Sequence, residues 1–315
     1  IKTMSYWDEK HSEDEDPFRK NCTEVAHRIS TKGALRIMCC IDGSNQADAA
    51  FHSALNMRRK FDHVEVFHAY KDIPDLQPAT WRYNQLRSKY ETELIGHIPT
   101  SMYSMMWIDR KGIDVNTMLH SCVDPEHFGS NARDPSPLTY PPDLIIMGKH
   151  GRKGPKEQKF AIGSTADQAL RNLHYPCLII KNVVPAGPRN ILMAVDDSPR
   201  SKRGLDILLR FTNPRDTLTL VHFTRSMTYN HALADANNAF KKYYDDELRE
   251  MGPVDSKFIF VEVEHGADIA DSIVDYANES SADVFAIAPR ATKDRSSITE
   301  KIVGNVMISV LLCKN

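Results

Sequence analysis

The sequence predicts an α/β protein made of two similar domains in tandem, each a five-stranded parallel sheet with helices on both faces. From Ala34 onwards, short apolar runs alternate with stretches whose apolar residues recur at helical spacing. The same order of elements begins again near residue 190. Strands separated by helices form βαβ units, which produce parallel sheets. The length of 315 residues also allows two domains of ordinary size.

The first domain is predicted over residues 34–182. Its apolar runs are short and end at turn residues, as expected of buried strands, and the segments between them carry helical patterns. Strands are predicted at 34–41, 63–70, 102–109, 143–151 and 177–182, with helices at about 45–60, 78–97, 113–121 and 164–173.

The second domain is predicted over residues 190–315, after a linker at 183–189 that contains Pro and Gly. Strands are predicted at 190–198, 217–223, 258–266, 284–290 and 308–315, with helices at 201–211, 230–250, 268–280 and 297–305. Similar residues recur at matching places in the two series, and one internal duplication explains all of them. They are Asp42 and Asp196, His68 and His222, and Lys181–Asn182 and Lys314–Asn315.

Two further segments have no counterpart in the repeat. Residues 1–33 are polar and acidic, so we expect an extended N-terminal arm. This arm is either a solvated tail or a segment that docks on a protein partner through Tyr6, Trp7 and Phe18. Residues 121–142 are rich in Pro, Ser, Asn and Asp, which predicts a surface insertion, either inert or used to bind a partner.

Composition excludes several classes of function. The net charge of −2 provides no basic face for nucleic acid, and no run of 18 apolar residues predicts a membrane span. None of the six cysteines has C-x-x-C spacing, which favours reduced, buried thiols and a cytoplasmic location. The histidines show no metal-ligand spacing, and no G-x-S-x-G nucleophile motif occurs, so neither a metal site nor a hydrolase triad is predicted.

The stretch at 147–170 carries the most specific chemical signal. Gly148, Gly151 and Gly154 follow the fourth strand, and glycine allows both close approach of the backbone to a phosphate and positive φ. Gly163, Ser164 and Thr165 then open a helix whose unpaired N–H groups and dipole favour an anion. Four residues add positive charge around this loop. They are Lys149, His150, Arg152 and Lys153.

These glycines fit neither the Walker A motif nor the dinucleotide fingerprint that follows a first strand. Their order resembles that of the universal stress protein family, whose ATP-binding members carry G-x2-G-x9-G-[ST]. Gly148-x2-Gly151 and Gly163-Ser164-Thr165 match the two ends of this motif, whereas 152–162 holds 11 residues in place of nine. The resemblance covers about 34–182 and 189–315.

The resemblance implies ATP or AMP in the first domain, with Mg²⁺ accompanying ATP. Asp42 would lie near the adenosine moiety, and the backbone at Ala69 would meet adenine. The remaining contacts would come from the loop, at Gly148, His150, Gly151, Gly163, Ser164 and Thr165. In this family the fifth strands commonly pair between subunits, so 177–182 and 308–315 are expected to pair here within one chain, as a pseudo-dimer.

The second domain lacks the glycines of this loop. Pro289 and Ala291 stand in the loop after the strand, and both restrict the approach of a backbone to phosphate. Asp196 is retained, and its expected role is to form the turn after the strand. We therefore expect no binding of a triphosphate in the second domain.

Two functions remain open. The first is a nucleotide-binding regulatory or stress-response protein with little or no turnover, since no catalytic base is evident beside the loop. The second is a scaffold within a larger assembly, in which the nucleotide site is partial or vestigial. The degenerate second domain, the acidic arm and the insertion support this alternative.

Overall fold

The computed structural model describes residues 33–70, 77–109, 141–151, 162–225, 231–253, 255–289 and 297–314, together with Val115, Thr117, Leu119 and Val123. Almost all of the predicted arm (1–33) and most of the predicted insertion (121–142) lie outside these residues.

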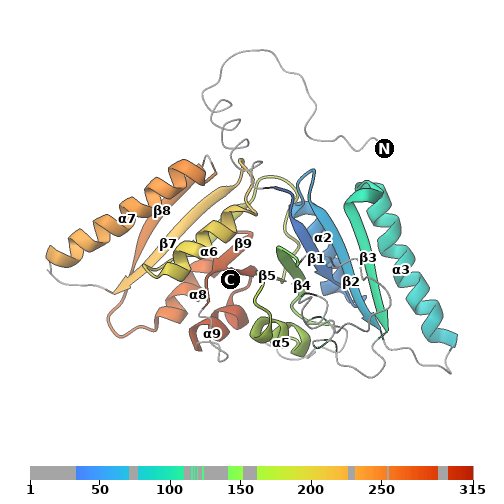
Figure 1. Ribbon diagram of the computed structural model, residues 1–315. Coiled ribbons are helices and arrows are strands. Elements are labelled where there is room, and N and C mark those ends of the chain that lie inside the picture. Colours follow the sequence, from blue (N-terminus) through green and yellow to red (C-terminus); the bar gives the residue numbers. More distant parts are fainter. Residues whose placement is uncertain are drawn as a thin grey trace, which may run out of the picture.

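The described strands form one sheet that runs through the whole molecule (Figure 1). They are β1 (Arg36–Cys40), β2 (His63–Tyr70), β3 (Tyr103–Asp109), β4 (Leu144–Gly148), β5 (Cys177–Ile180), β6 (Asn190–Ala194), β7 (Thr217–Arg225), β8 (Asp255–Val263), β9 (Val284–Ile287) and β10 (Ser309–Leu312). Their order across the sheet is β3-β2-β1-β4-β5-β10-β9-β6-β7-β8. Neighbours within each five-stranded half are parallel, whereas β5 and β10 are antiparallel. The predicted fold class and the predicted pairing of 177–182 with 308–315 are confirmed.

Helices cover both faces of the sheet. They are α2 (Asn45–Met57), α3 (Gln77–His97), α5 (Ser164–Asn172), α6 (Pro199–Leu209), α7 (His231–Met251), α8 (Ile269–Glu279) and α9 (Ser297–Asn305), and a short 3₁₀ turn, η1, spans Thr100–Met102. Core residues of α2, α3, α6 and α7 pack on one face, and those of α5, α8 and α9 pack on the other. Each of these two cores contains residues of both domains, so the hydrophobic interior is continuous across the β5–β10 junction.

Most predicted elements in the described part of the chain are found within two or three residues of their expected limits. Strand β6 ends at Ala194 instead of residue 198, and β8 is displaced as a whole, since it begins at Asp255 and ends at Val263 instead of covering 258–266. Its first residues are polar, yet they pair in register with β7, because an edge strand tolerates polar side chains on its exposed positions. Of the helix predicted at 113–121, the structure describes only Val115, Thr117 and Leu119, all helical.

Hydrogen bonds repeated at a constant spacing of 154 positions document the duplication. The His68 Nδ1 lies 2.8 Å from the Ile41 carbonyl, and the His222 Nδ1 lies 2.8 Å from the Val195 carbonyl. At the start of the first strands, Asp62 accepts the Leu35 N–H at 2.8 Å and Asp216 accepts the Arg189 N–H at 2.9 Å. The same side chains therefore fix the same turns in both domains.

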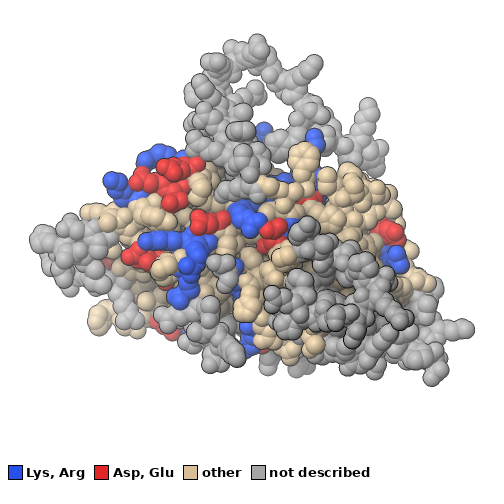
Figure 2. Space-filling view, viewed as in Figure 1, with Lys and Arg blue, Asp and Glu red and all other residues tan. Residues whose placement is uncertain are grey.

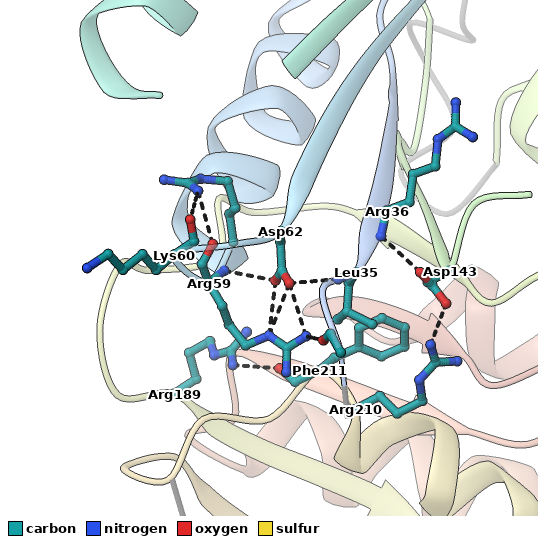
Figure 3. A network of polar contacts seen from close by, with 11 residues as sticks. Leu35, Arg36, Arg59, Lys60, Asp62, Asp143, Arg189, Arg210 and Phe211 are labelled. Atoms are coloured by element: carbon teal, nitrogen blue, oxygen red, sulfur yellow. Dashed lines mark hydrogen bonds and ion pairs between the residues drawn. The ribbon is translucent and has the colours of Figure 1, made fainter. Parts of the chain in front are cut away.

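Figure 3 shows the polar network at the amino-terminal ends of the first strands. The Arg59 guanidinium donates to the buried Asp62 carboxylate, and the buried Arg189 donates to the Phe211 carbonyl at 2.8 Å. Asp143 accepts the Arg36 N–H at 2.9 Å and also pairs with the Arg210 guanidinium, which extends from the end of α6. The Asp143–Arg210 pair joins the two domains at the amino-terminal ends of the strands.

Two lysine side chains, one from each domain, reach across the β5–β10 junction to the other domain. Lys181, directly after β5, donates from Nζ to the Val303 carbonyl at 2.7 Å and to the Val306 carbonyl, at the end of α9. Lys314, shortly after β10, donates to the Leu173 carbonyl at 2.8 Å and to the Leu170 carbonyl, at the end of α5. Each domain thus supplies a lysine amine that donates to carbonyls at the carboxyl end of a helix in the other domain.

Acidic and basic side chains are mixed on the face seen in Figure 2. Arg171 of α5 illustrates this pattern, since it pairs with Asp167 on its own helix at 3.0 Å and with Glu300 of α9 at 2.7 Å. The mixture agrees with the formal net charge of −2.

Lys181 should make stability depend on pH. Burial, and after it the charge of Lys149, lowers the pKa of Lys181 to about 7. An unfolded lysine titrates near 10.4, so between these values the unfolded chain binds more protons and the free energy of unfolding rises with pH. Urea unfolding at about pH 7 and about pH 8.5 should show a gain on the order of 1 kcal/mol in wild type that is missing from Lys181→Met. Equal gains in the two proteins would show that Lys181 does not titrate there.

Candidate functional site

An acidic turn follows β1 and fixes the Asp42 carboxylate at the carboxyl end of the sheet. The Asp42 Oδ1 accepts the Ser44 N–H at 3.0 Å, and the Ser44 hydroxyl accepts the Ala47 N–H at 3.1 Å, which caps α2. Gly43 between them has a φ of 77°, a conformation that other residues rarely adopt. A Cβ at Gly43 would also lie 3.0 Å from Leu86 of α3. The turn therefore requires glycine, which the sequence motif alone did not single out.

Gly148 and Gly151 bring the end of β4 against this turn. A Cβ at Gly148 would lie 2.8 Å from the backbone of Gln46, and a Cβ at Gly151 would lie 2.6 Å from the Asp42 Oδ2. Neither glycine has positive φ, and the described glycines that do are Gly33, Gly43, Gly187 and Gly266. Positive φ is therefore not the reason for glycine at these two positions, and the structure adds a reason that the sequence did not predict, which is close packing against Gln46 and Asp42.

Gly163 brings the start of α5 to the same place. Its N–H donates to the Lys149 carbonyl at 2.8 Å, and a Cβ on it would lie 3.3 Å from the His150 Cα. Gly163 is also the N-cap of α5, and no side chain caps this helix, whereas Ser44, Ser198 and Asp268 cap α2, α6 and α8. Ser164 and Thr165 are exposed in the first turn. Within the part of the chain that the structure describes, the start of α5 therefore has no side-chain cap.

Buried polar atoms without hydrogen-bond partners lie next to the loop. Among the described residues, the His150 Nδ1 and the Gln46 Oε1 are buried and make no hydrogen bond. Burial, followed by the charges of Lys149 and Lys181, lowers the pKa of His150, so its imidazole is neutral near pH 7. Unpartnered buried polar atoms are uncommon in folded proteins and are expected where a ligand or water supplies the partner.

The positive charge expected around the loop is only partly available. Lys149 is 9% exposed, and burial lowers its pKa. Its backbone N–H donates to Ile180, so the residue ties the loop to β5. Arg152, Lys153 and Gly154 lie outside the described residues.

Ala69 lies at the carboxyl end of β2, the strand beside β1. It pairs in register with Ile108 of β3 and is half-buried. The neighbouring His68 ring contacts the Trp107 ring edge-on at a centroid distance of 4.7 Å. The Trp107 Nε1 is buried and without a partner among the described residues. Ala69 and Ile108 pack on the opposite face of the sheet from Trp107. The structure therefore places the His68–Trp107 pair and Ala69 at the same carboxyl ends of the strands as Asp42, on different faces, and sequence spacing did not identify Trp107.

The second domain forms the same acidic turn without the same loop. Asp196 Oδ1 accepts the Ser198 N–H at 3.0 Å, which confirms its predicted role in the turn. The strand register places Ala288 where the first domain has Gly148. Gly204 of α6 makes room for it, since a Cβ on Gly204 would lie 2.6 Å from the Ala288 Cβ. The connection from β9 to α9 is also shorter than that from β4 to α5.

The described residues contain no group of three or more His, Cys, Asp or Glu side chains that could hold a metal ion. Within the same part of the chain, no helix is both long and apolar enough to cross a membrane. The cysteines at positions 39, 40, 177 and 313 are free thiols.

Comparison with known proteins identifies relatives of both domains. The sequence profile of the universal stress protein family matches residues 139–181 and 187–314, which is more than half of the chain. No curated protein sequence matches significantly. A universal stress protein from Archaeoglobus fulgidus DSM 4304 is 15% identical, with a TM-score of 0.59 over 89% of this chain and 98% of its own. A putative universal stress protein from Pseudomonas aeruginosa UCBPP-PA14 is 16% identical, with a TM-score of 0.57 over 91% and 94%.

A family protein from Arabidopsis thaliana was solved with AMP bound. It is 14% identical and covers 39% of this chain and 89% of its own, and its TM-score of 0.31 is too low to inform on ligands here. The two full-length structural matches establish a shared fold, and the family profile adds the sequence relationship. The chain belongs to the universal stress protein family.

Proposed function

We propose that the first domain binds an adenine nucleotide, ATP or AMP, and that the protein acts as a nucleotide-binding regulatory protein of the stress response. The observation that carries this proposal is the close packing of three glycines around one loop: Gly151 lies against Asp42, Gly148 against Gln46 of α2, and Gly163, the N-cap of α5, against the backbone at Lys149 and His150. Close-packed backbone beside free helix N–H groups is the usual form of a phosphate site.

Different residues of this site would bind different parts of the nucleotide. The N–H groups at the start of α5 and the Ser164 and Thr165 hydroxyls would bind phosphate oxygens. Asp42 would accept a hydrogen bond from the ribose hydroxyls, and the backbone at Ala69 would face adenine. The His150 Nδ1, buried and without a hydrogen-bond partner among the described residues, lies at the same loop and would also face the ligand.

Mg²⁺ would accompany ATP and be held mainly by the phosphates. No carboxylate cage for it exists among the described residues. Asp42, the acidic residue at the loop, already accepts the Ser44 N–H through one oxygen. Mg²⁺ usually takes one or two carboxylates together with phosphates and water, so the site fits a nucleotide-borne ion.

We expect binding with little or no hydrolysis. General base catalysis requires a group placed to accept a proton from the attacking water. The Asp42 carboxylate, the acidic group of the described residues at this loop, already accepts the Ser44 N–H in the turn. Such a site suits a regulatory role, in which the bound nucleotide shifts a conformational equilibrium of the protein.

A scaffold with a vestigial nucleotide site is the alternative function. The observation in its favour is that Ala288 stands at the strand end where the first domain has Gly148, and that Gly204 makes room for it. The second domain thus keeps the fold without a glycine at this strand end. Failure of the wild-type protein to bind any adenine nucleotide would select this alternative.

Gly151→Val should abolish binding while the protein stays folded. The new side chain would collide with the Asp42 carboxylate, which is the end of a side chain and can move without disturbing the core. We expect Mg-ATP or AMP to raise the Tm of wild type and to leave that of Gly151→Val unchanged. The matched control is Gly96→Val, because a Cβ at Gly96 meets nothing within 4 Å. A ligand shift in Gly151→Val equal to that of wild type would contradict the site.

The stoichiometry of binding should be one nucleotide per chain, in the first domain. Isothermal titration calorimetry of wild type should give one site, and Gly163→Asp should remove it by placing a carboxylate at the start of α5. Two sites in wild type, or one site that survives Gly163→Asp, would show that the second domain binds nucleotide.

A further inference from the structure

Helix α5 is held at its two ends by different domains. At its start, the Gly163 N–H donates to Lys149 of the first domain at 2.8 Å. At its end, the Leu170 and Leu173 carbonyls accept hydrogen bonds from Lys314 of the second domain. In Figure 1, α5 and α9 lie next to each other below the β5–β10 junction. The helix that opens the proposed phosphate site is thus partly anchored by the domain that lacks such a site.

The helix is short, and few of its residues are buried. It spans only Ser164–Asn172, and its buried residues are Ala166, Ala169 and Leu170. Helices this short are marginal by themselves and depend on tertiary contacts. Arg171 adds an ion pair to Glu300 of α9 at 2.7 Å, but both side chains are about 40% exposed. Exposed pairs contribute little, so the half-buried Lys314 is the stronger contact between α5 and the second domain.

The Lys314 ammonium and a bound phosphate would complement the same helix dipole. A cation at the carboxyl end and an anion at the amino end are both favourable, and each satisfies backbone groups that the helix leaves unpaired. Both also require the helix axis to stay where the sheet and the loop place it.

We infer that Lys314 of the second domain positions the phosphate helix of the first domain, so that the domain without a phosphate loop sets the nucleotide affinity of the domain with one. This inference rests on the proposed nucleotide site for its functional consequence. Lys314 acts as a positioning residue through α5 and does not touch the ligand.

The consequence for affinity follows from preorganisation. The Ser164 and Thr165 N–H groups move with α5, so a helix that shifts or frays presents them correctly in only a fraction of molecules. The apparent affinity is the intrinsic affinity multiplied by the fraction of competent molecules. If removal of the Lys314 contacts leaves a third or less of molecules competent, the Kd rises about threefold or more.

The duplication supplies an internal control. Lys181 makes the mirror-image contacts with the Val303 and Val306 carbonyls of α9, a helix that opens no glycine loop. Lys181→Met and Lys314→Met therefore remove equivalent bonds across the same junction. Only the second variant loosens the helix of the proposed site. Measurement at about pH 8 keeps Lys181 largely neutral, which limits its electrostatic effect on the loop.

The experiment uses the full chain and has two readouts. Hydrogen–deuterium exchange without nucleotide should be faster over Ser164–Asn172 in Lys314→Met, and faster over Ser297–Asn305 in Lys181→Met. Calorimetric titration with Mg-ATP and with AMP should show a Kd raised about threefold or more in Lys314→Met only. Lys314→Arg retains a charged donor and should restore both readouts, which a loss of overall stability would not explain.

Each result decides the proposal. Unchanged exchange over α5 in Lys314→Met would overturn it, as would equal loss of affinity in both methionine variants. If Lys314→Met does not fold, Lys314→Gln, which keeps a shorter donor, is measured against Lys314→Arg under the same criteria. If wild type binds no nucleotide, the proposed function fails, and exchange over α5 alone decides whether Lys314 positions the helix.

Discussion

The antiparallel pairing of β5 with β10 is the interaction on which the rest of the structure depends. Each five-stranded half would otherwise end in an apolar edge strand open to solvent or to aggregation. Paired, Cys177–Ile180 and Ser309–Leu312 are fully buried, and the cores on both faces of the sheet continue from one domain into the other. The strands are short, so polar contacts at their ends define the register. Lys181 and Lys314 cap helices across the junction, and the Ser309 hydroxyl donates to the Asn182 carbonyl at 2.9 Å.

The bonds that define the fold are separate from those that would bind a ligand. Asp42 and Asp196 form the same turn, and His68 and His222 lie at the same distance from a backbone carbonyl. None of these contacts depends on the loop after β4 or β9. The second domain therefore keeps its structure without the loop glycines, and Gly204 of α6 makes room for Ala288 at the end of β9. An acidic residue after the first strand is accordingly no sign of a ligand by itself.

Strands and helices were predictable because their signals are local. A buried parallel strand is an uninterrupted apolar run, and the recurrence of such runs in the same order along the chain indicates the duplication. Boundaries were less certain where an edge strand is polar, as at Asp255 in β8. The close packing of the loop glycines was also not predicted. Steric crowding at Gly148 and Gly151 comes from Gln46 and Asp42, which are distant in sequence.

Residue types and their spacing were enough to predict the class of fold, the duplication, the asymmetry between the two loops and the likeness to the universal stress protein family. The tertiary structure alone decided which atoms meet. Lys314 follows Leu170 by well over a hundred positions, and only the antiparallel strand pair brings its amine to the end of α5. The burial of Lys149 and the unpartnered His150 Nδ1 likewise depend on side chains from several elements at once. Such long-range contacts leave no periodicity in the sequence, so they could be recognised only in the folded chain.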